Sequence, residues 1–353
     1  MNKNYLISTG GSGGHVIPGT ILYEHLIKEA NVIISSDKRG LKYLGNDYEF
    51  KIIDTPKLNN FLLLPFNLII ILILTIKSFF LLKNKNIEKV FSTGGYMSLP
   101  VILAAKLFDI KIYLLEPNLV LGRANKFFLN SCEKIFCYTE KIKNFPSKYK
   151  NKIEIIHPLV RDRIYKINRL SSEKDKFNLL IVGGSQGASI FDKIIKNKVV
   201  EISKKFPIRV IQQTSKENIL NLKDFYQKNN VESSIFNFDL NFEKTLIKSD
   251  LCITRAGATT LAELSVLNIP FIAVPLPSSK DNHQLENANF YKENGCCWIL
   301  NQVSFEEKIE ELLVDILKNK TDFLNKKDSL KKLNYQNTWI NVNQKILNII
   351  NEN

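Results

Sequence analysis

Each half of this chain opens with a short apolar run that leads directly into a cluster of glycines. Residues 4–8 precede Gly10-Gly11-Ser12-Gly13-Gly14, and residues 177–182 precede Gly183-Gly184-Ser185-Gln186-Gly187. From each cluster onwards, short apolar segments alternate with longer amphipathic ones, which is typical of α/β proteins with parallel sheets. The near-repeat therefore predicts the α/β class with two Rossmann-like domains, and 353 residues are enough for two.

The expected elements follow from this alternation. We expect strands at residues 4–8, 31–35, 89–92, 111–115 and 134–138, and in the second half at 177–182, 208–212, 251–254 and 270–274. Helical patterns lie between them, for example at 18–28 and 259–267, and another lies near the end of the chain at 337–350. A polar stretch at 168–176 is the expected linker between the two halves.

The positive charge is concentrated in one segment. The net charge is +14, and residues 83–166 hold 16 basic residues against 7 acidic ones. Such a surplus indicates nucleic acid, an anionic membrane or phosphorylated substrates as partners. Lysine enrichment from an AT-rich genome is another source of charge, but it leaves the clustering unexplained. Nucleic acid is disfavoured because the chain lacks interleaved aromatic residues and a nucleic-acid-binding motif.

An uncharged apolar segment, residues 58–76, precedes the basic one. Its 19 residues meet the length of a membrane-spanning helix, although Asn59, Asn60, Pro65 and Asn67 interrupt it. A span would place the first glycine cluster on the opposite side of the membrane from everything after residue 77. Three interpretations stay open, namely a span, a buried core helix and a helix in the membrane interface, and the last is favoured.

The cysteines and the N-terminus indicate a reducing cytoplasm. The cysteine count of 5 is odd and no Cys-x-x-Cys occurs, which argues against a disulfide framework and against a zinc site. The apolar run at residues 5–8 is too short for a signal peptide and leads straight into glycines.

Three strand–glycine–helix junctions, at residues 8–15, 92–96 and 182–188, indicate phosphate binding. Glycine allows the backbone to approach an anion closely, and the following helix N-terminus attracts it. No Gly-Lys-Ser/Thr follows these loops, which disfavours an ATPase or GTPase. Val16 stands where a dinucleotide fingerprint needs glycine, which disfavours NAD. Because no Asp-x-Asp occurs, we expect no metal or cofactor, and a diphosphate must be neutralised by helix N-termini and basic side chains.

The second half carries a denser constellation of polar residues, which runs from Arg255 to Glu263 and from residue 281 to 288. Thr259 or Thr260 is expected to cap the helix that begins there. Glu263 is expected near its first turn, where a carboxylate suits the hydroxyls of a ribose, and a capping role is the alternative. Gln284 and Asn287 lie three residues apart, on one helical face, and suit sugar hydroxyls.

Together these motifs resemble the MurG family, the N-acetylglucosaminyltransferases of peptidoglycan synthesis, over essentially the whole chain. Ser92-Thr93-Gly94-Gly95-Tyr96 and Glu116-x-Asn118 complete the pattern. The resemblance implies a GT-B fold, in which two Rossmann-like domains face each other across a cleft. It divides the chain into an acceptor and membrane-associating domain (1–167), a UDP-GlcNAc-binding domain (168–334) and a C-terminal helix (335–353) that returns to the first domain.

The implied reaction is the transfer of GlcNAc from UDP-GlcNAc to lipid I, undecaprenyl-diphosphate-MurNAc-pentapeptide, which gives lipid II with inversion. The implied location is peripheral, on the cytoplasmic face of an anionic membrane. Roles in cell shape, cell division and the cell cycle are implied too, with cell-wall synthesis and division proteins as candidate partners. Another GT-B enzyme that uses a UDP-sugar, such as a glycolipid glycosyltransferase or a UDP-GlcNAc epimerase, is the alternative.

The resemblance also implies site residues. His15 is the first candidate for the general base and Glu116 the second. The loops implied for the acceptor diphosphate contain Gly10, Gly11, Gly94, Gly95 and Tyr96. The residues implied for UDP-GlcNAc are Ser12, Gly13, Gly14, Asn118, Arg161, Ser185, Asp239, Arg255, Ala258, Thr260, Glu263, His283, Gln284 and Asn287.

The chain departs from the family pattern at two of these positions. The segment His157-Pro158-Leu159-Val160-Arg161 has one residue more than the family's Asn-Pro-Val-Arg, so Arg163 is an alternative to Arg161 for contacting UDP. Asp239 replaces a hydrophobic residue whose backbone contacts uracil, and a backbone contact is compatible with that change.

Overall fold

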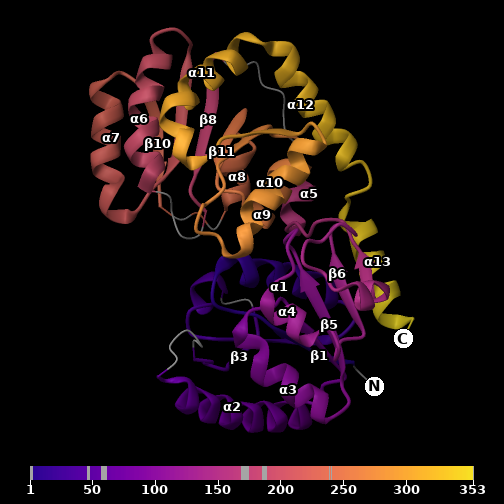
Figure 1. Cartoon of the computed structure of the whole chain (residues 1–353). Helices are drawn as coiled ribbons and strands as arrows, with labels where there is room; N and C mark the ends of the chain where they lie inside the picture. The colour runs from indigo at the N-terminus through magenta and orange to yellow at the C-terminus, as the bar shows by residue number, and fades with distance from the viewer. Residues whose placement is uncertain are drawn as a thin grey trace. The chain divides into compact units, whose positions relative to one another are not determined.

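The computed structural model describes residues 3–45, 48–56, 62–167, 175–184, 189–237, 239 and 241–352. The chain forms two compact units (Figure 1). The first unit contains residues 1–159 and 339–353, and the second contains residues 160–338. The boundaries expected at residues 167 and 334 thus lie at 159 and 338 in the structure.

The first unit is built on a seven-stranded parallel sheet in the order β3-β2-β1-β4-β5-β6-β7. Its strands are β1 (Asn4–Ser8), β2 (Asn31–Ser36), β3 (Phe50–Ile52), β4 (Lys89–Ser92), β5 (Lys111–Glu116), β6 (Lys134–Cys137) and β7 (Ile153–Ile155). Its helices are α1 (Gly13–Leu26), α2 (Leu64–Asn84), α3 (Leu99–Leu107), α4 (Arg123–Phe128) and α13 (Trp339–Asn351). Ser8 pairs with both Ser35 and Ser92, so the carboxyl ends of the adjacent strands β2, β1 and β4 lie level.

The second unit has a six-stranded parallel sheet in the order β10-β9-β8-β11-β12-β13. Its strands are β8 (Phe177–Val182), β9 (Ile208–Gln213), β10 (Glu232–Phe236), β11 (Leu251–Thr254), β12 (Phe271–Ala273) and β13 (Cys297–Ile299). Its helices are α5 (Asp162–Lys166), α6 (Ser189–Ser203), α7 (Ile219–Lys228), α8 (Phe242–Leu246), α9 (Ala258–Val266), α10 (His283–Glu293), α11 (Phe305–Lys318) and α12 (Lys320–Leu333).

The α/β class and the two parallel sheets confirm the fold expected from the sequence, and all nine expected strands are present within a residue or two. Four strands are additional, and all four are sheet edges, namely β3, β7, β10 and β13. They have three to five residues and are half or fully exposed over most of their length. Edge strands pack on fewer neighbours, so their sequences need no apolar run.

The helix expected at residues 18–28 was placed too late, because α1 begins at Gly13, within the glycine cluster. The expectation placed Pro18 at the first helical position, where proline is over-represented. Instead Pro18 lies inside the helix. The glycine cluster is therefore both the loop and the first turn of α1.

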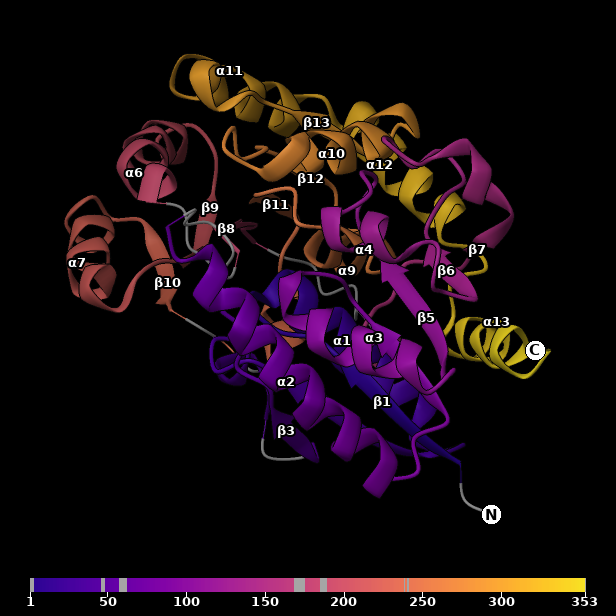
Figure 2. The same cartoon turned by 60° about the horizontal axis from the view of Figure 1, so that its bottom comes forward.

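A row of four aromatic rings defines the core on one face of the first sheet. Tyr5, Phe91, Tyr113 and Phe136 come from four adjacent strands, with successive ring centroids 5.2 to 6.1 Å apart. Residues of α1 and α13 cover them. Helix α13 docks there through Trp339, which stacks on His25 at 3.7 Å between ring centroids. The opposite face of the sheet is covered by α2 and α3, which pack side by side (Figure 2).

Candidate functional site

Two glycine loops meet at the carboxyl edge of the first sheet. Gly11, Gly94 and Gly95 have φ of 74°, 82° and 80°, which is the left-handed region that favours glycine. A Cβ at Gly95 would lie 2.2 Å from the sulfur of Met97, so a larger residue would have to displace that side chain. The hydroxyl of Thr93 donates to Thr9 Oγ1 at 2.8 Å and ties the two loops together at their bases.

His15 lies on the first turn of α1, between these loops. Its Nδ1 is 2.8 Å from the carbonyl oxygen of Thr93. A carbonyl only accepts hydrogen bonds, so Nδ1 carries the proton and Nε2 is the basic nitrogen of the neutral ring. The ring also approaches the second loop, since a Cβ on Gly95 would lie 3.5 Å from His15 Cδ2. The backbone thus holds His15 in the tautomer that a general base requires.

The amides of the first glycine loop are not equivalent. The amide of Gly11 donates to Asp37 Oδ1 at 2.7 Å, and the amide of Ser12 donates to Gly10 O at 2.9 Å. Ser12 is the N-cap of α1, yet its hydroxyl makes no capping hydrogen bond. The amides of Gly13 and Gly14 belong to the first helical turn and have no partner within the helix. Gly13, Gly14 and the Ser12 hydroxyl are therefore the donors best suited to an anion.

Glu116 is organised as an anchor rather than as an open base. Its Oε1 accepts from the backbone and side-chain amides of Asn118, each at 3.2 Å. Its Oε2 accepts from Gly122 N at 2.8 Å and from Asn125 Nδ2 at 2.9 Å. Burial raises the pKa of the Glu116 carboxyl, and these hydrogen bonds oppose the rise. Four donors occupy the four lone-pair positions of a carboxylate, so Glu116 holds the loop that presents Asn118.

The glycine loop of the second unit is described only in part. Gly184 follows β8 with a φ of 76°, and no atom of the described residues lies within 4 Å of a Cβ added there. Ser185, expected at the donor diphosphate, lies outside the described residues. The described part of the loop therefore leaves open space beside the backbone, as close ligand approach requires.

Arg161 and Glu263 form a buried ion pair in the second unit. Arg161 Nη1 lies 2.7 Å from Glu263 Oε1, and the Glu263 side chain is 3% exposed. Burial raises the pKa of Glu263, and the charge of Arg161 partly opposes that rise. Arg163 instead reaches Glu243 at 3.4 Å and is 47% exposed. The structure thus brings Arg161, not Arg163, against the glutamate expected at the ribose.

The start of α9 differs from the expected one. Its N-cap is Gly257, and the helix begins at Ala258. Thr259 and Thr260 therefore lie inside the first turn, and the expectation that one of them caps the helix was wrong. Glu263 falls in the second turn and is buried. Ala258 and Thr260 remain half-buried at the amino end of the helix, where its dipole favours an anion.

Arg255 and Asn287 are engaged within the protein. Arg255 Nη1 donates to Val274 O at 3.0 Å, and its Nη2 donates to Gln302 Oε1 at 2.6 Å. Asn287 is buried, and its Nδ2 donates to Ala256 O at 3.1 Å. These hydrogen bonds of Arg255 and Asn287 therefore hold the turn between β11 and α9 in place.

The turn before α10 is conformationally unusual. Asp281 and Asn282 have φ of 52° and 56°, a left-handed conformation that costs energy outside glycine and often marks a functional site. Gln284 Oε1 accepts from Leu276 N at 2.9 Å, which directs its amide nitrogen away from that bond. His283 Nδ1 lies 2.8 Å from Lys280 O. These bonds fix both side chains at the start of the helix.

Asp239 has a local role that sequence reasoning did not foresee. Its Oδ1 accepts from Asn241 N at 2.8 Å and its Oδ2 from Thr245 Oγ1 at 2.9 Å. The side chain thus holds the start of α8. Within the described ranges, no group of three or more His, Cys, Asp or Glu side chains is arranged to hold a metal ion.

Known proteins resemble this chain over its whole length. The chain matches the N-terminal domain of glycosyltransferase family 28 over residues 5–137 and the C-terminal domain of that family over residues 178–338. It is 48% identical to the UDP-N-acetylglucosamine–N-acetylmuramyl-(pentapeptide) pyrophosphoryl-undecaprenol N-acetylglucosamine transferase of Pelagibacter ubique (strain HTCC1062), over 100% of both chains. The protein of the same name in Rickettsia felis is 34% identical, over 90% of this chain and 91% of that one.

Solved structures show the same fold at lower identity. The MurG of Acinetobacter baumannii superposes with a TM-score of 0.75 at 22% identity, over 100% of both chains. The UDP-GlcNAc 2-epimerase of Neisseria meningitidis superposes with a TM-score of 0.67 at 15% identity, over 99% of this chain and 100% of that one. The full-length relatives and the two domain matches together decide the family. This chain belongs to glycosyltransferase family 28 and, within it, to the MurG enzymes.

Proposed function

We propose that this chain is an inverting hexosyltransferase that moves GlcNAc from UDP-GlcNAc to lipid I and so makes lipid II for peptidoglycan synthesis. The observation that carries the proposal is the 48% identity, over the whole of both chains, to a transferase named for that reaction. The glycine loops and the Arg161–Glu263 pair supply a matching chemistry for phosphates and a ribose.

The second unit is the proposed donor site. The amino end of α9, with Ala258 and Thr260, and the guanidinium of Arg161 would offset the charge that develops on UDP as it leaves. Glu263 would accept hydrogen bonds from the ribose hydroxyls. Gln284 would meet the GlcNAc hydroxyls with its amide nitrogen, because its amide oxygen already accepts from Leu276 N.

The first unit is the proposed acceptor site, with His15 as the base. Nε2 of His15 takes the proton of the acceptor hydroxyl, and the resulting oxygen attacks the anomeric carbon from the face opposite UDP. The new carbon–oxygen bond forms as the bond to the diphosphate breaks, and UDP leaves with that electron pair. Asn118, held by Glu116, is proposed to contact the sugar nucleotide. We propose that this step needs no metal ion.

The experiment that tests this function follows labelled GlcNAc from UDP-GlcNAc to a lipid I analogue in the presence of EDTA. We expect one β-linked GlcNAc per acceptor and one UDP released for each sugar transferred. Loss of all turnover with EDTA would contradict the metal-free step, and conversion of UDP-GlcNAc without an acceptor would favour an epimerase instead.

We further propose that α2 binds the cytoplasmic face of the membrane. This helix is long and apolar enough to cross a bilayer, but it buries several polar residues and exposes a row of large apolar ones. Its buried residues include Asn67, Thr75 and Ser78. Its exposed large apolar residues are Phe66, Leu68, Ile69, Leu72, Ile73, Ile76 and Phe80.

This exposed face argues for the interface over the other two interpretations of the segment. A buried core helix would not expose these side chains by 48 to 62%. A spanning helix would be surrounded by lipid, whereas α2 packs along α3 (Figure 2) and buries Asn67, Thr75 and Ser78. Lys77 of α2 and Lys106 of α3 are exposed, and their charge suits anionic lipid headgroups. A membrane position would bring the enzyme to cell-wall synthesis and division proteins, the candidate partners in cell growth and shape.

Replacing Ile69 and Ile73 together by serine should weaken binding to anionic vesicles by at least about tenfold, because two inserted apolar side chains are lost. Co-sedimentation with phosphatidylglycerol vesicles measures the effect. Leu220→Ser/Leu324→Ser, at two exposed leucines of the second unit, is the matched control and should bind as the wild type does. Equal binding of the wild type to neutral and anionic vesicles would contradict the role of the basic residues.

A further inference from the structure

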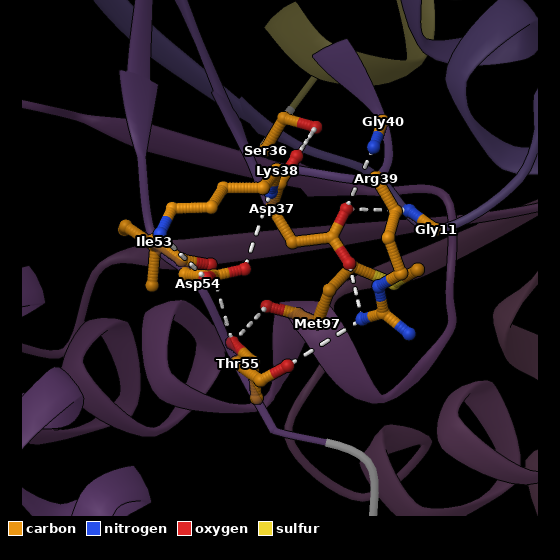
Figure 3. A network of polar contacts seen from close by, with 10 residues as sticks. All are labelled: Gly11, Ser36, Asp37, Lys38, Arg39, Gly40, Ile53, Asp54, Thr55 and Met97. Carbon is orange, nitrogen blue, oxygen red and sulfur yellow. Dashed lines mark hydrogen bonds and ion pairs between the residues drawn. The ribbon is translucent and has the colours of Figure 1, made fainter. Parts of the chain in front are cut away.

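A fully buried carboxylate holds the first glycine loop. Asp37 directly follows β2, and its side chain is 0% exposed. Oδ1 accepts from Gly11 N at 2.7 Å and from Gly40 N at 3.0 Å, and Oδ2 pairs with Arg39 (Figure 3). In dinucleotide-binding Rossmann folds, an acid at the end of this strand takes ribose hydroxyls. Here backbone amides occupy it, so Asp37 shapes the loop instead of a nucleotide site.

The guanidinium of Arg39 reaches from this carboxylate to the second glycine loop. Its Nη2 pairs with Asp37 and donates to Thr55 O at 3.4 Å, and its Cζ lies 4.9 Å from the ring centroid of Tyr96. The side chain is 34% exposed. Among the residues that the structure describes, none accepts a hydrogen bond from its Nε or Nη1. Arg39 is thus fixed at one nitrogen and keeps donors for a further partner.

Met97 keeps the two loops together around Arg39. Thr55 Oγ1 donates to Met97 O at 3.3 Å (Figure 3). A Cβ on Gly11 would lie 2.6 Å from Met97 Cε, so the first loop lies directly against this side chain. Both loops, the end of β3 and Arg39 therefore form one packed unit. A charged side chain held in this way loses little entropy when it binds a ligand.

We propose that Arg39 binds the diphosphate of the lipid-linked acceptor, with Asp37 and Tyr96 as the groups that orient it. The inference rests on the proposed function and adds a specific cation to the acceptor site. A guanidinium matches the spacing of phosphate oxygens and forms charge-assisted hydrogen bonds with them. The amides of Gly13 and Gly14, at the start of the neighbouring helix, would complete the contact. Asp37 fixes where the guanidinium lies, and Arg39 compensates the carboxylate charge.

Steady-state kinetics on Arg39→Gln tests the proposal. We expect the KM for a lipid I analogue to rise about 10- to 100-fold, the loss expected for charge-assisted bonds, while the KM for UDP-GlcNAc changes less than about twofold. Lys38→Gln is the matched control because it removes the same charge one residue away. Lys38 is 72% exposed and faces Asp54 at 3.5 Å, so both KM values should stay at those of the wild type. An unchanged acceptor KM in Arg39→Gln would overturn the proposal.

The double variant Asp37→Asn/Arg39→Gln separates binding from charge balance. In Arg39→Gln the buried Asp37 carboxylate loses its charged partner, which should lower the melting temperature. In the double variant asparagine still accepts from Gly11 and Gly40 and no buried charge is left unpaired, so the melting temperature should return toward that of the wild type. The acceptor KM should stay as high as in Arg39→Gln. A return of that KM to the wild-type value would overturn the proposal, because Arg39 would then serve only to neutralise Asp37.

Direct titration with farnesyl diphosphate distinguishes this inference from the proposed function. We expect Arg39→Gln to weaken binding of this probe about tenfold or more, whether or not sugar transfer is observed. If the wild type fails to transfer sugar but Arg39→Gln still binds the probe more weakly than the wild type, the proposed function alone is contradicted. Unchanged binding of the probe by Arg39→Gln would overturn this inference alone.

Discussion

His15→Ala is expected to lower kcat by about 10²- to 10⁴-fold, the usual contribution of a positioned general base. The KM values for both substrates should change little. The ring accepts the proton in the transition state and contributes little to binding of the ground state. The wild-type rate should fall at low pH, where protonation of Nε2 removes the base, and His15→Ala should lose that dependence. Initial rates across a pH series measure both effects.

Glu116→Gln is the informative comparison. A glutamine amide would place NH₂ against at least one donor that now bonds to the carboxylate, from Asn118, Gly122 or Asn125. The free energy of unfolding should fall by about 1–3 kcal/mol, the cost of an unsatisfied buried group. The pH profile of the remaining activity should match the wild type, since the base is untouched. Loss of the pH dependence in Glu116→Gln, with its retention in His15→Ala, would reverse the two assignments.

Arg161→Ala is expected to have the second large effect, on donor binding and on stability together. It leaves the carboxylate of Glu263 buried without its partner, which for buried pairs costs about 3–5 kcal/mol. UDP affinity should fall about 10- to 100-fold, because a charge-assisted contact to phosphate is lost. Calorimetric titration with UDP and denaturant unfolding measure the two effects.

The stability defect of Arg161→Ala should depend on pH in a defined direction. Burial already raises the pKa of Glu263 and Arg161 opposes that rise, so its removal raises the pKa further. The folded variant then binds this proton more tightly than the unfolded chain, and its stability increases as the pH falls. The deficit relative to the wild type should therefore shrink between about pH 8 and about pH 5.

Two other substitutions control this experiment. Lys166→Ala removes an exposed partner of Asp162 and should leave stability within about 0.5 kcal/mol. Arg163→Ala should weaken UDP binding far less than Arg161→Ala, because Arg163 is half exposed and faces Glu243. A larger effect on UDP binding at Arg163 would assign the donor phosphate contact to that arginine instead.

The sequence predicted the buried central strands of this fold but not its edge strands or the start of α1. Central strands such as 4–8 and 251–254 are apolar runs because helices cover both of their faces. β3 and β10 lie at sheet edges and carry polar residues such as Lys51 and Ser233, which interrupt the apolar run. The start of α1 was missed because glycine is a poor helix former, and its position there reflects the loop geometry instead.

Sequence motifs found the residue types of the candidate site but not their contacts. Arg161 and Glu263 were both placed at the donor, yet their pairing joins residues about a hundred positions apart and depends on tertiary packing. The role of Asp37 at the glycine loop was missed, although its position at the end of β2 was a signal for it. Nothing in the sequence indicated that Arg255 would turn inward onto Val274 and Gln302.

The most direct test of the central claim is the fate of labelled GlcNAc when the purified protein, UDP-GlcNAc and a lipid I analogue are combined. We expect the label to appear in a β-1,4-linked disaccharide on the lipid, with one UDP released per sugar and with His15→Ala nearly inactive in the same assay. Label that stays in UDP-linked sugar, or that is transferred equally well by His15→Ala, would contradict the claim.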